Sequence, residues 1–328
     1  MTSFVCASHG HCFDGLASAA LLSSLVTSLE PSTQFTYRAL GYGPNPPQVH
    51  FTGEQNALLD YRYIPDAGLT YYIDHHPTAF LNDTEQSHFT ERREADPLHF
   101  VHDQHSPSCA RLVDQMARRD YGHDTEQNRE LVAFADKIDS ASFATVDEAI
   151  DLKSPFMRLV TAVTHFGDHK FYERAVPVLQ REGVAGLAAQ PWIKHQFHKI
   201  SPSIQALNQR IKEKGEVTGR VVLINLLDKP THVVSKFRQY YEFPGVMYSI
   251  ILMQMQENIR ISVGYNPWSG AECDVNIGGM CQAFGGGGHA FVGAIGLAEG
   301  RAQDALEIAQ HISLQLQTPQ KLQPPQLI

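Results

Sequence analysis

The sequence has 328 residues with a net charge of −9, and 43% of them are hydrophobic, which is the composition of an ordinary globular protein. Its 26 lysines and arginines form no basic run, which excludes the phosphate-neutralising surface that binds long duplex nucleic acid. Five cysteines without regular spacing indicate a reducing cytosol, and no apolar run reaches the ~20 residues of a membrane span, so we expect a soluble cytoplasmic protein.

The first half of the chain predicts an α/β domain. An apolar run at residues 3–8 is typical of a buried strand, and the apolar spacing of residues 13–29 is that of a helix. Further strands are predicted at residues 34–42, 56–60, 69–74 and 98–103, and further helices at residues 109–121 and 128–138. Several short helical patterns follow in residues 154–190, and we assign residues 1–190 to one domain.

The second half predicts a linker and a smaller domain. A helix is expected to begin at Ser201 as N-cap, with Pro202 in its first turn, and to end before Gly215, so residues 191–215 are assigned to a helical linker. Three β-rich runs, a helix-compatible segment and a closing helix follow within residues 216–317. Residues 318–328 are rich in proline and glutamine and are predicted to be disordered.

Metal-binding side-chain types cluster where the first strand meets the first helix. His9, His11, Cys12 and Asp14 fall within six positions. At the carboxyl end of a parallel strand, side chains point into the crevice where open α/β sheets bind ligands. The alternative is that Asp14 or Ser18 only caps the helix while the histidines are solvated.

A second cluster, Asp74, His75 and His76, directly follows an apolar run. Such residues are costly to bury unless they are paired or metal-bound. Asp60 ends another presumed strand. It is a weaker signal by itself, since an aspartate at the end of a strand often only starts a turn.

Asp136 and Asp139 lie three positions apart on a predicted helix, where two carboxylates either converge on one point or are both solvated. Together with the clusters above they form a set of oxygen and nitrogen ligands. Such a set suits Mn²⁺, with Mg²⁺ or Co²⁺ as alternatives, and is large enough for two ions.

The glycine run Gly285–Gly288, followed by His289, is the most specific string in the chain. Consecutive glycines expose backbone N–H groups and let a phosphate approach the chain closely. A flexible linker is a poor alternative, because the flanking Phe284 and the apolar stretch after His289 are typical of ordered structure.

The runs IDHH at 73–76 and GGGGH at 285–289 together resemble the DHH phosphoesterase superfamily in its two-domain DHH–DHHA1 form, over roughly residues 3–300. The resemblance implies a parallel-sheet DHH domain with two metal ions, usually manganese, and a DHHA1 domain with a mixed sheet that binds substrate. The metal ligands it implies are His9, His11 or Cys12, Asp14, Asp60, His75 and Asp136. The implied catalytic residues are Asp74 in support of His75, His76 facing the phosphate, and His289. The implied substrate-binding residues are His76, Gly286, Gly287, Gly288, His289 and Ser262.

The chain departs from the family pattern in two places. The first motif commonly has the form D-x-D-G, but here Cys12 stands at the position of the first aspartate, with His11 beside it. Many relatives carry a Ser-x-Arg that grips phosphate, and this chain keeps Ser262 but has Gly264 in place of the arginine.

The resulting expectation is a metal-dependent phosphohydrolase that activates water with two ions. Its expected substrates are short oligonucleotides, cyclic dinucleotides, bisphosphonucleosides or polyphosphate. One alternative is a single-strand exonuclease, which would need a basic groove with stacking aromatics. Another is a nucleotide-binding regulatory protein that does not hydrolyse its ligand, because its metal site is altered. The oligomeric state stays open between a monomer and a homodimer.

Overall fold

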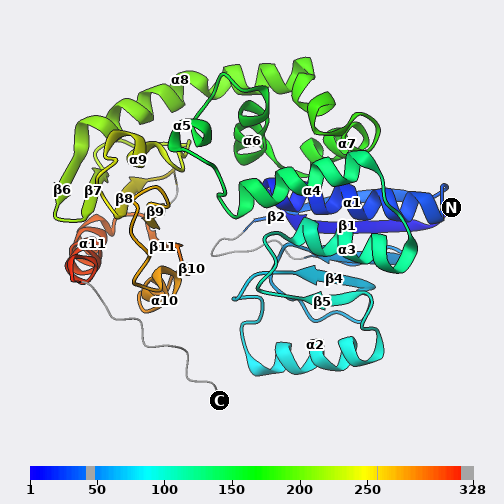
Figure 1. Ribbon diagram of the computed structural model, residues 1–328. Helices are drawn as coiled ribbons and strands as arrows, with labels where there is room; N and C mark the ends of the chain where they lie inside the picture. The colour runs from blue at the N-terminus through cyan, green and yellow to red at the C-terminus, as the bar shows by residue number, and fades with distance from the viewer. Residues whose placement is uncertain (42–48, 257, 319–328) are drawn as a thin grey trace. The chain divides into compact units, whose positions relative to one another are not determined.

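The computed structural model describes residues 1–41, 49–256 and 258–318 (Figure 1). The chain divides into two compact units, the first made of Met1–Phe143 and Asp151–Lys199, the second of Ala144–Ile150 and the chain from Ile200 onward. Among the described residues, no helix is long and apolar enough to cross a membrane. The end of the strand predicted at 34–42 and the tail predicted from 319 lie outside the described residues.

The first unit is organised around a five-stranded sheet with the order β2-β1-β3-β4-β5. Every pairing in it is parallel. The strands are β1 (Ser3–His9), β2 (Gln34–Leu40), β3 (Gln55–Leu59), β4 (Tyr71–Asp74) and β5 (Phe100–His102). The strand order reverses between β1 and β3, and the carboxyl ends of strands at such a switch point are where open α/β sheets bind ligands.

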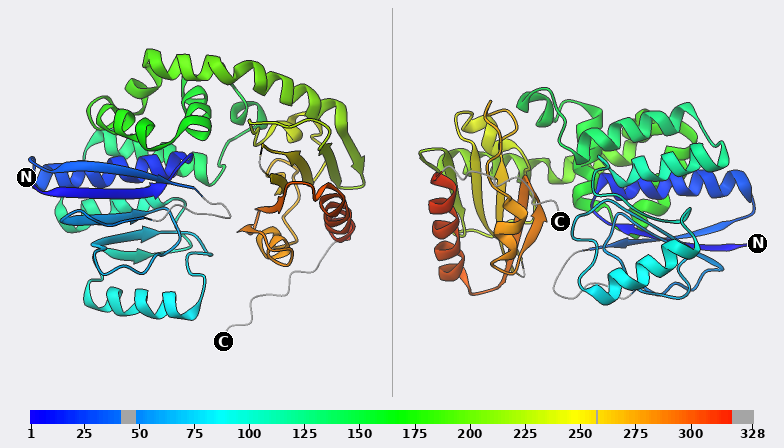
Figure 2. Two further views of the ribbon diagram at one scale, coloured as in Figure 1. Left: turned by 180° about the vertical axis from the view of Figure 1, so that it is seen from behind. Right: turned by 60° about the horizontal axis from the view of Figure 1, so that its bottom comes forward.

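Helices cover both faces of this sheet, as Figures 1 and 2 show. Alternate residues such as Phe4 and Cys6 enter the larger apolar cluster, whereas Ala7 and Tyr72 enter the smaller one together with Phe89. The larger cluster lies under α1 (Phe13–Leu29), α3 (Cys109–Tyr121), α4 (Glu126–Asp139), α6 (Pro155–Phe166) and α7 (His169–Ala189). Phe89 belongs to α2 (Asp83–Ala95), which covers the other face.

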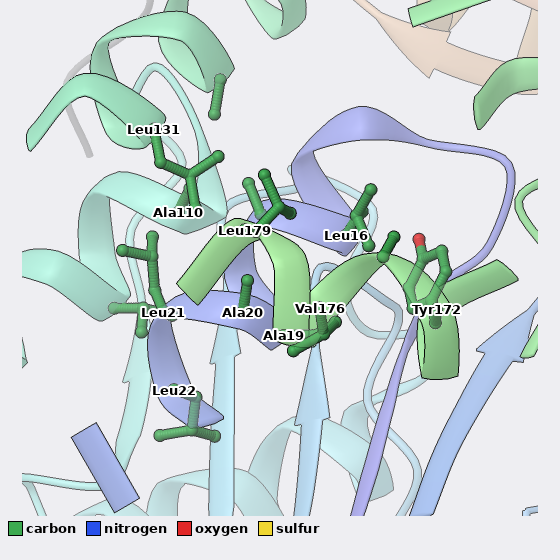
Figure 3. Packing of buried hydrophobic residues seen from close by; sticks show 14 of the residues in the cluster. Leu16, Ala19, Ala20, Leu21, Leu22, Ala110, Leu131, Tyr172, Val176 and Leu179 are labelled. Carbon is green, nitrogen blue, oxygen red and sulfur yellow. The ribbon is translucent and has the colours of Figure 1, made fainter. Parts of the chain in front are cut away.

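Small side chains let α1 lie close to α7. Figure 3 shows Ala19 and Ala20 of α1 beside Val176 and Leu179 of α7, and all four are buried. Methyl groups at the contact allow the two helix backbones to approach, so α7 reaches over the start of α1, where the metal-binding side chains begin.

The second unit contains a six-stranded sheet with the order β10-β11-β9-β8-β7-β6, in which only β7 and β8 pair in parallel. Its strands are β6 (Gly215–Thr218), β7 (Val221–Leu226), β8 (Tyr248–Gln254), β9 (Asn258–Tyr265), β10 (Gly287–His289) and β11 (Val292–Ala298). Its helices are α5 (Val146–Ala149), α9 (Arg238–Glu242), α10 (Ile277–Gln282) and α11 (Ala302–Gln317). The predicted fold class, a parallel-sheet α/β domain with a smaller mixed-sheet α/β domain, is confirmed.

The predicted start of the linker helix is wrong. The helix α8 runs from Pro191 to Lys214, so Ser201 and Pro202 lie inside it, and the two units divide within it, between Lys199 and Ile200. Its buried side chains recur at helical spacing on both sides of the proline: Ile193, Phe197, Ile200, Ile204, Leu207 and Ile211. This continuous apolar face outweighs the one backbone hydrogen bond that Pro202 removes.

Candidate metal centre

The candidate residues of the first unit lie at one edge of its sheet. β1 ends at His9, Asp60 directly follows β3, and Asp74 ends β4 with His75 and His76 after it. Because parallel strands have their carboxyl ends on the same edge, these five side chains are brought together at the switch point between β1 and β3.

The first group of potential ligands consists of His9, Cys12 and Asp60, whose ligand atoms all lie within 4.8 Å of one another. His9 Nδ1 is 3.6 Å from Asp60 Oδ2. The tight turn between β1 and α1 requires Gly15, because a Cβ there would lie 2.1 Å from the carbonyl oxygen of His9. Tyr172 of α7 fixes the same turn by donating its hydroxyl hydrogen to the carbonyls of His9 and Cys12, at 2.7 and 3.2 Å.

The second group consists of Asp14, His75 and Asp139, again within 4.8 Å. His75 Nε2 lies 3.6 Å from Asp14 Oδ2 and 3.4 Å from Asp139 Oδ2. Asp14 is fully buried and accepts the backbone N–H groups of Cys109 and Ala110 at the start of α3. The positive end of that helix therefore holds the carboxylate in place.

Asp60 joins the two groups. A third set, Asp60 with His75 and His76, also satisfies the 4.8 Å limit, and His75 Nε2 is 3.6 Å from Asp60 Oδ1. Both carboxylate oxygens of Asp60 are buried and have no hydrogen-bond partner within the described part of the chain. Its φ of 53° is in the left-handed region, where a non-glycine residue costs about 1–3 kcal/mol. A strained, buried carboxylate without a hydrogen bond is expected of a residue that binds a cation.

The electrostatics of the cluster favour a bound cation. Burial raises the pKa of Asp14 well above its usual value, and the nearby carboxylates of Asp60 and Asp139 raise it further. Burial alone would lower the pKa of His75, but Asp60 and the other carboxylates raise it to about 10. The cluster thus draws a proton onto an imidazole to offset its negative charge, and divalent cations would supply the same compensation while leaving the ring neutral.

Hydrogen bonds orient the histidines of the cluster. His75 Nδ1 lies 3.1 Å from the carbonyl oxygen of Ser106, and His76 Nδ1 lies 2.7 Å from Asp74 Oδ1. A proton held on Nδ1 leaves Nε2 of a neutral ring as the coordinating nitrogen. His75 Nε2 is therefore the nitrogen of this ring that we expect to bind a cation.

Three of the candidate substrate residues of the second unit, Gly287, His289 and Ser262, lie on one face of its sheet, whereas Gly288 lies on the other. Gly287 pairs with Ala294, which pairs with Ser262, and His289 pairs with Val292, which pairs with Gly264. Gly287 faces open space, whereas a Cβ on Gly286 or Gly288 would collide with β11.

Arg260 lies on this same face and was not predicted from the sequence. It is two residues before Ser262 on β9, and its Nε donates a hydrogen bond to Ser262 Oγ at 3.1 Å. The expected arginine position, Gly264, has no room for a side chain, because its Cβ would lie 2.6 Å from the hydroxyl oxygen of Tyr240. The arginine beside Ser262 is therefore Arg260, which precedes the serine by two residues, whereas the family pattern places it two residues after the serine.

Comparisons with known proteins identify the architecture. No protein-family model matches the sequence, and no curated protein matches it. Among solved structures, the pGpG-specific phosphodiesterase PggH from Vibrio cholerae is similar with a TM-score of 0.63 and 20% identity, over 96% of this chain and 100% of that one. RecJ from Thermus thermophilus, in complex with Mn²⁺, has a TM-score of 0.59 and 10% identity, over 97% of this chain and 53% of RecJ. A DHH domain has a TM-score of 0.57 and 13% identity, over 96% of this chain and 87% of that one. The chain has the fold of the DHH-domain proteins.

Within this DHH fold, the two aspartates near the end of α4, Asp136 and Asp139, have different surroundings. Asp136 accepts hydrogen bonds from Ser108 Oγ at 2.6 Å and Arg111 Nε at 3.0 Å, so its charge is already compensated. It belongs to none of the three potential ligand groups found among the described residues, whereas Asp139 belongs to one of them. Asp136 instead ties α4 to the start of α3.

Two further expectations about the DHH motifs change. His11 belongs to none of these groups either; its φ is 59°, and its backbone N–H donates to the carbonyl of Gly167. Cys12 is therefore the better-placed member of the pair. Asp74 was expected to support His75, but its hydrogen bond goes to His76.

Proposed function

We propose that this chain is a metal-dependent phosphohydrolase that binds two divalent cations. One ligand group is His9, Cys12 and Asp60, and the other is Asp14, His75 and Asp139. The observation that carries the proposal is that these groups have no residue in common, while Asp60 lies 3.6 Å from the central histidine of the other group. When bound, such a pair of ions stabilises negative charge on a phosphoryl group and lowers the pKa of water.

The residues of the chain position the ions and the phosphate. Asp14, anchored on α3, and Asp60, fixed at the end of β3, hold the carboxylates rigidly. His76, whose Nδ1 is bonded to Asp74, would place its imidazole against a phosphoryl oxygen. A carboxylate behind an imidazole favours its positive charge, which opposes the negative charge that develops during phosphoryl transfer.

The second unit would recognise the substrate through an anionic group. Arg260, Ser262 and His289 carry polar side chains on one face of the sheet, and Gly287 has no side chain there to block an approaching anion. The similarity to the pGpG-specific phosphodiesterase covers nearly the full length of both chains. We therefore favour short oligonucleotides with a terminal phosphate, such as pGpG, over cyclic dinucleotides and bisphosphonucleosides. The net charge of −9 argues against a single-strand exonuclease.

The test is hydrolysis of pGpG by the full chain with Mn²⁺, Mg²⁺ or Co²⁺. We expect turnover by the wild type, no detectable turnover by His75→Ala, and wild-type turnover by His169→Ala, which replaces an exposed histidine at the start of α7. Tight pGpG binding without hydrolysis under every metal would contradict the proposal and favour the regulatory alternative.

A further inference from the structure

The two ligand groups differ in their donor atoms. The group Asp14, His75 and Asp139 offers two carboxylates and one imidazole, whereas the group His9, Cys12 and Asp60 offers one imidazole, one thiol and one carboxylate. Carboxylates suit hard ions such as manganese and magnesium, but a thiolate selects softer ions such as zinc. The two positions are thus unequal in the metals they favour.

The cysteine is held in place by the backbone around it. Cys12 is the N-cap residue of α1, with an extended φ of −119°. Before it the chain turns at His11, whose φ is 59°, and the carbonyl of Cys12 accepts a hydrogen bond from Tyr172. This arrangement sets Cys12 Sγ within 4.8 Å of ligand atoms of His9 and Asp60.

Asp60 provides a second, independent sign of a ligand at this position. Its side chain is 1% exposed, and neither of its oxygens makes a hydrogen bond to any described residue, although nitrogens of His9 and His75 lie 3.6 Å from them. A buried carboxylate in this state is costly unless a cation binds it. Both the thiol and the carboxylate therefore point to a metal at this position.

Cys12 also differs from the other cysteines of the first unit. Burial raises the pKa of the Cys6 thiol to about 12 and that of Cys109 well above its usual value. Both are fully buried in the apolar core, whereas Cys12 is partly exposed at the edge of the sheet. Of these three, Cys12 is the thiol that an ion from solution can reach.

We infer that the centre is mixed, with zinc at His9, Cys12 and Asp60 and manganese at Asp14, His75 and Asp139. This inference rests on the proposed two-ion function and assigns the metals within it. It follows that the cysteine in the first motif changes the metal at one position and does not abolish metal binding.

Cobalt substitution tests the inference independently of activity. The metal-free full chain is titrated with Co²⁺, and a near-ultraviolet thiolate-to-cobalt charge-transfer band is expected for the wild type. Cys12→Ser and Cys12→Asp should lose the band. Cys273→Ser, which replaces a partly exposed thiol of the second unit, should keep it. Two variants at position 12, each checked by circular dichroism, guard against a folding defect in either one.

Competition for zinc gives the second readout. The experiment uses a large excess of Mn²⁺, because zinc outcompetes manganese at nitrogen and oxygen ligands when the two are equally concentrated. Titration with a zinc chelator should remove zinc from Cys12→Asp at a zinc affinity about tenfold or more below that of the wild type. Cobalt binding without a thiolate band, or an unchanged zinc affinity in Cys12→Asp, would overturn the inference and leave the phosphohydrolase proposal standing. A wild-type chain that binds none of these metals would overturn both.

Discussion

The candidate sites of the two units are built in opposite ways. In the first unit the chemistry depends on buried charge: Asp14 and Asp60 have no exposed surface, and Asp60 is also strained. In the second unit the candidate groups are small or at least partly exposed, with Gly287 facing open space, His289 half-buried and Arg260 exposed. Burying carboxylates destabilises the fold but binds cations tightly, whereas exposed donors recognise an anion with little effect on stability. Substitutions in the two units should therefore have different signatures.

The largest effect is expected for Asp60→Asn. Loss of a ligand near both groups should lower kcat/KM by at least ~10³-fold, since metal ions contribute several kcal/mol to transition-state stabilisation. The metal-free variant should be less stable than metal-free wild type by roughly 1–3 kcal/mol, because it leaves the buried imidazole of His75 without the carboxylate that favours its protonated form. Activity assays and urea titrations measure the two effects. Asp83→Asn, at an exposed position in the first turn of α2, should leave activity unchanged and lower stability by less than about 1 kcal/mol, and full metal content in Asp60→Asn would contradict the assignment.

A smaller effect, confined to substrate binding, is expected for Arg260→Ala. Loss of a charge-assisted hydrogen bond of about 1.5–3 kcal/mol should raise KM for pGpG roughly tenfold to a hundredfold with little change in kcat. Metal content and stability should stay as in the wild type. Arg301→Ala is the matched control, because Arg301 is an exposed arginine of the same unit that pairs with the neighbouring Asp304. An equal rise in KM for a substrate without a terminal phosphate would argue against the role.

Removing the metal ions should lower the stability of the first unit and leave that of the second unit unchanged. At a metal concentration a hundred times Kd, each ion stabilises the folded state by about 2.7 kcal/mol, so a chelator that removes both ions should destabilise the first unit by about 5.4 kcal/mol. Hydrogen exchange followed by mass spectrometry can resolve this, with faster exchange expected in peptides from β1 and α4 and no change in β8 and β9. Uniform acceleration across both units would show that metal binding is not confined to the first.

The sequence predicted the neighbourhood of the first site because strand geometry is local. His9, Asp60 and His75 each stand at the end of a short apolar run, and a parallel sheet brings such ends together. The different surroundings of Asp136 and Asp139 were not predictable, because the partners of Asp136 are Ser108 and Arg111 at the start of another helix. No spacing rule within α4 contains that information.

The start of α8 and the position of Arg260 could have been predicted from the sequence. The apolar positions at Ile193, Phe197 and Ile200 continue the period of the helix after Pro202, and weighing that period over the Ser-Pro dipeptide would have extended the helix. Arg260 alternates with the buried Ile259 and Ile261, which places it on the same strand face as Ser262. The glycine at 264 could not be explained, since Tyr240 contacts it from another element.

The smallest effect is expected for Tyr172→Phe, and it tests how far rigidity in the first unit matters. The tyrosine hydroxyl bonds to the carbonyls of His9 and Cys12, and so acts on the turn and not on the ligand atoms. Losing these hydrogen bonds should lower stability by about 1 kcal/mol and, because the turn loosens, weaken metal binding roughly fivefold. Tyr37→Phe is the matched control: its hydroxyl donates to Ser23 in the same core, so it should lose similar stability while metal affinity stays unchanged. Isothermal titration with Mn²⁺ and Zn²⁺ measures the difference. Equal metal affinities in the two variants would mean that buried charge alone, without a rigid turn, accounts for binding at this edge of the sheet.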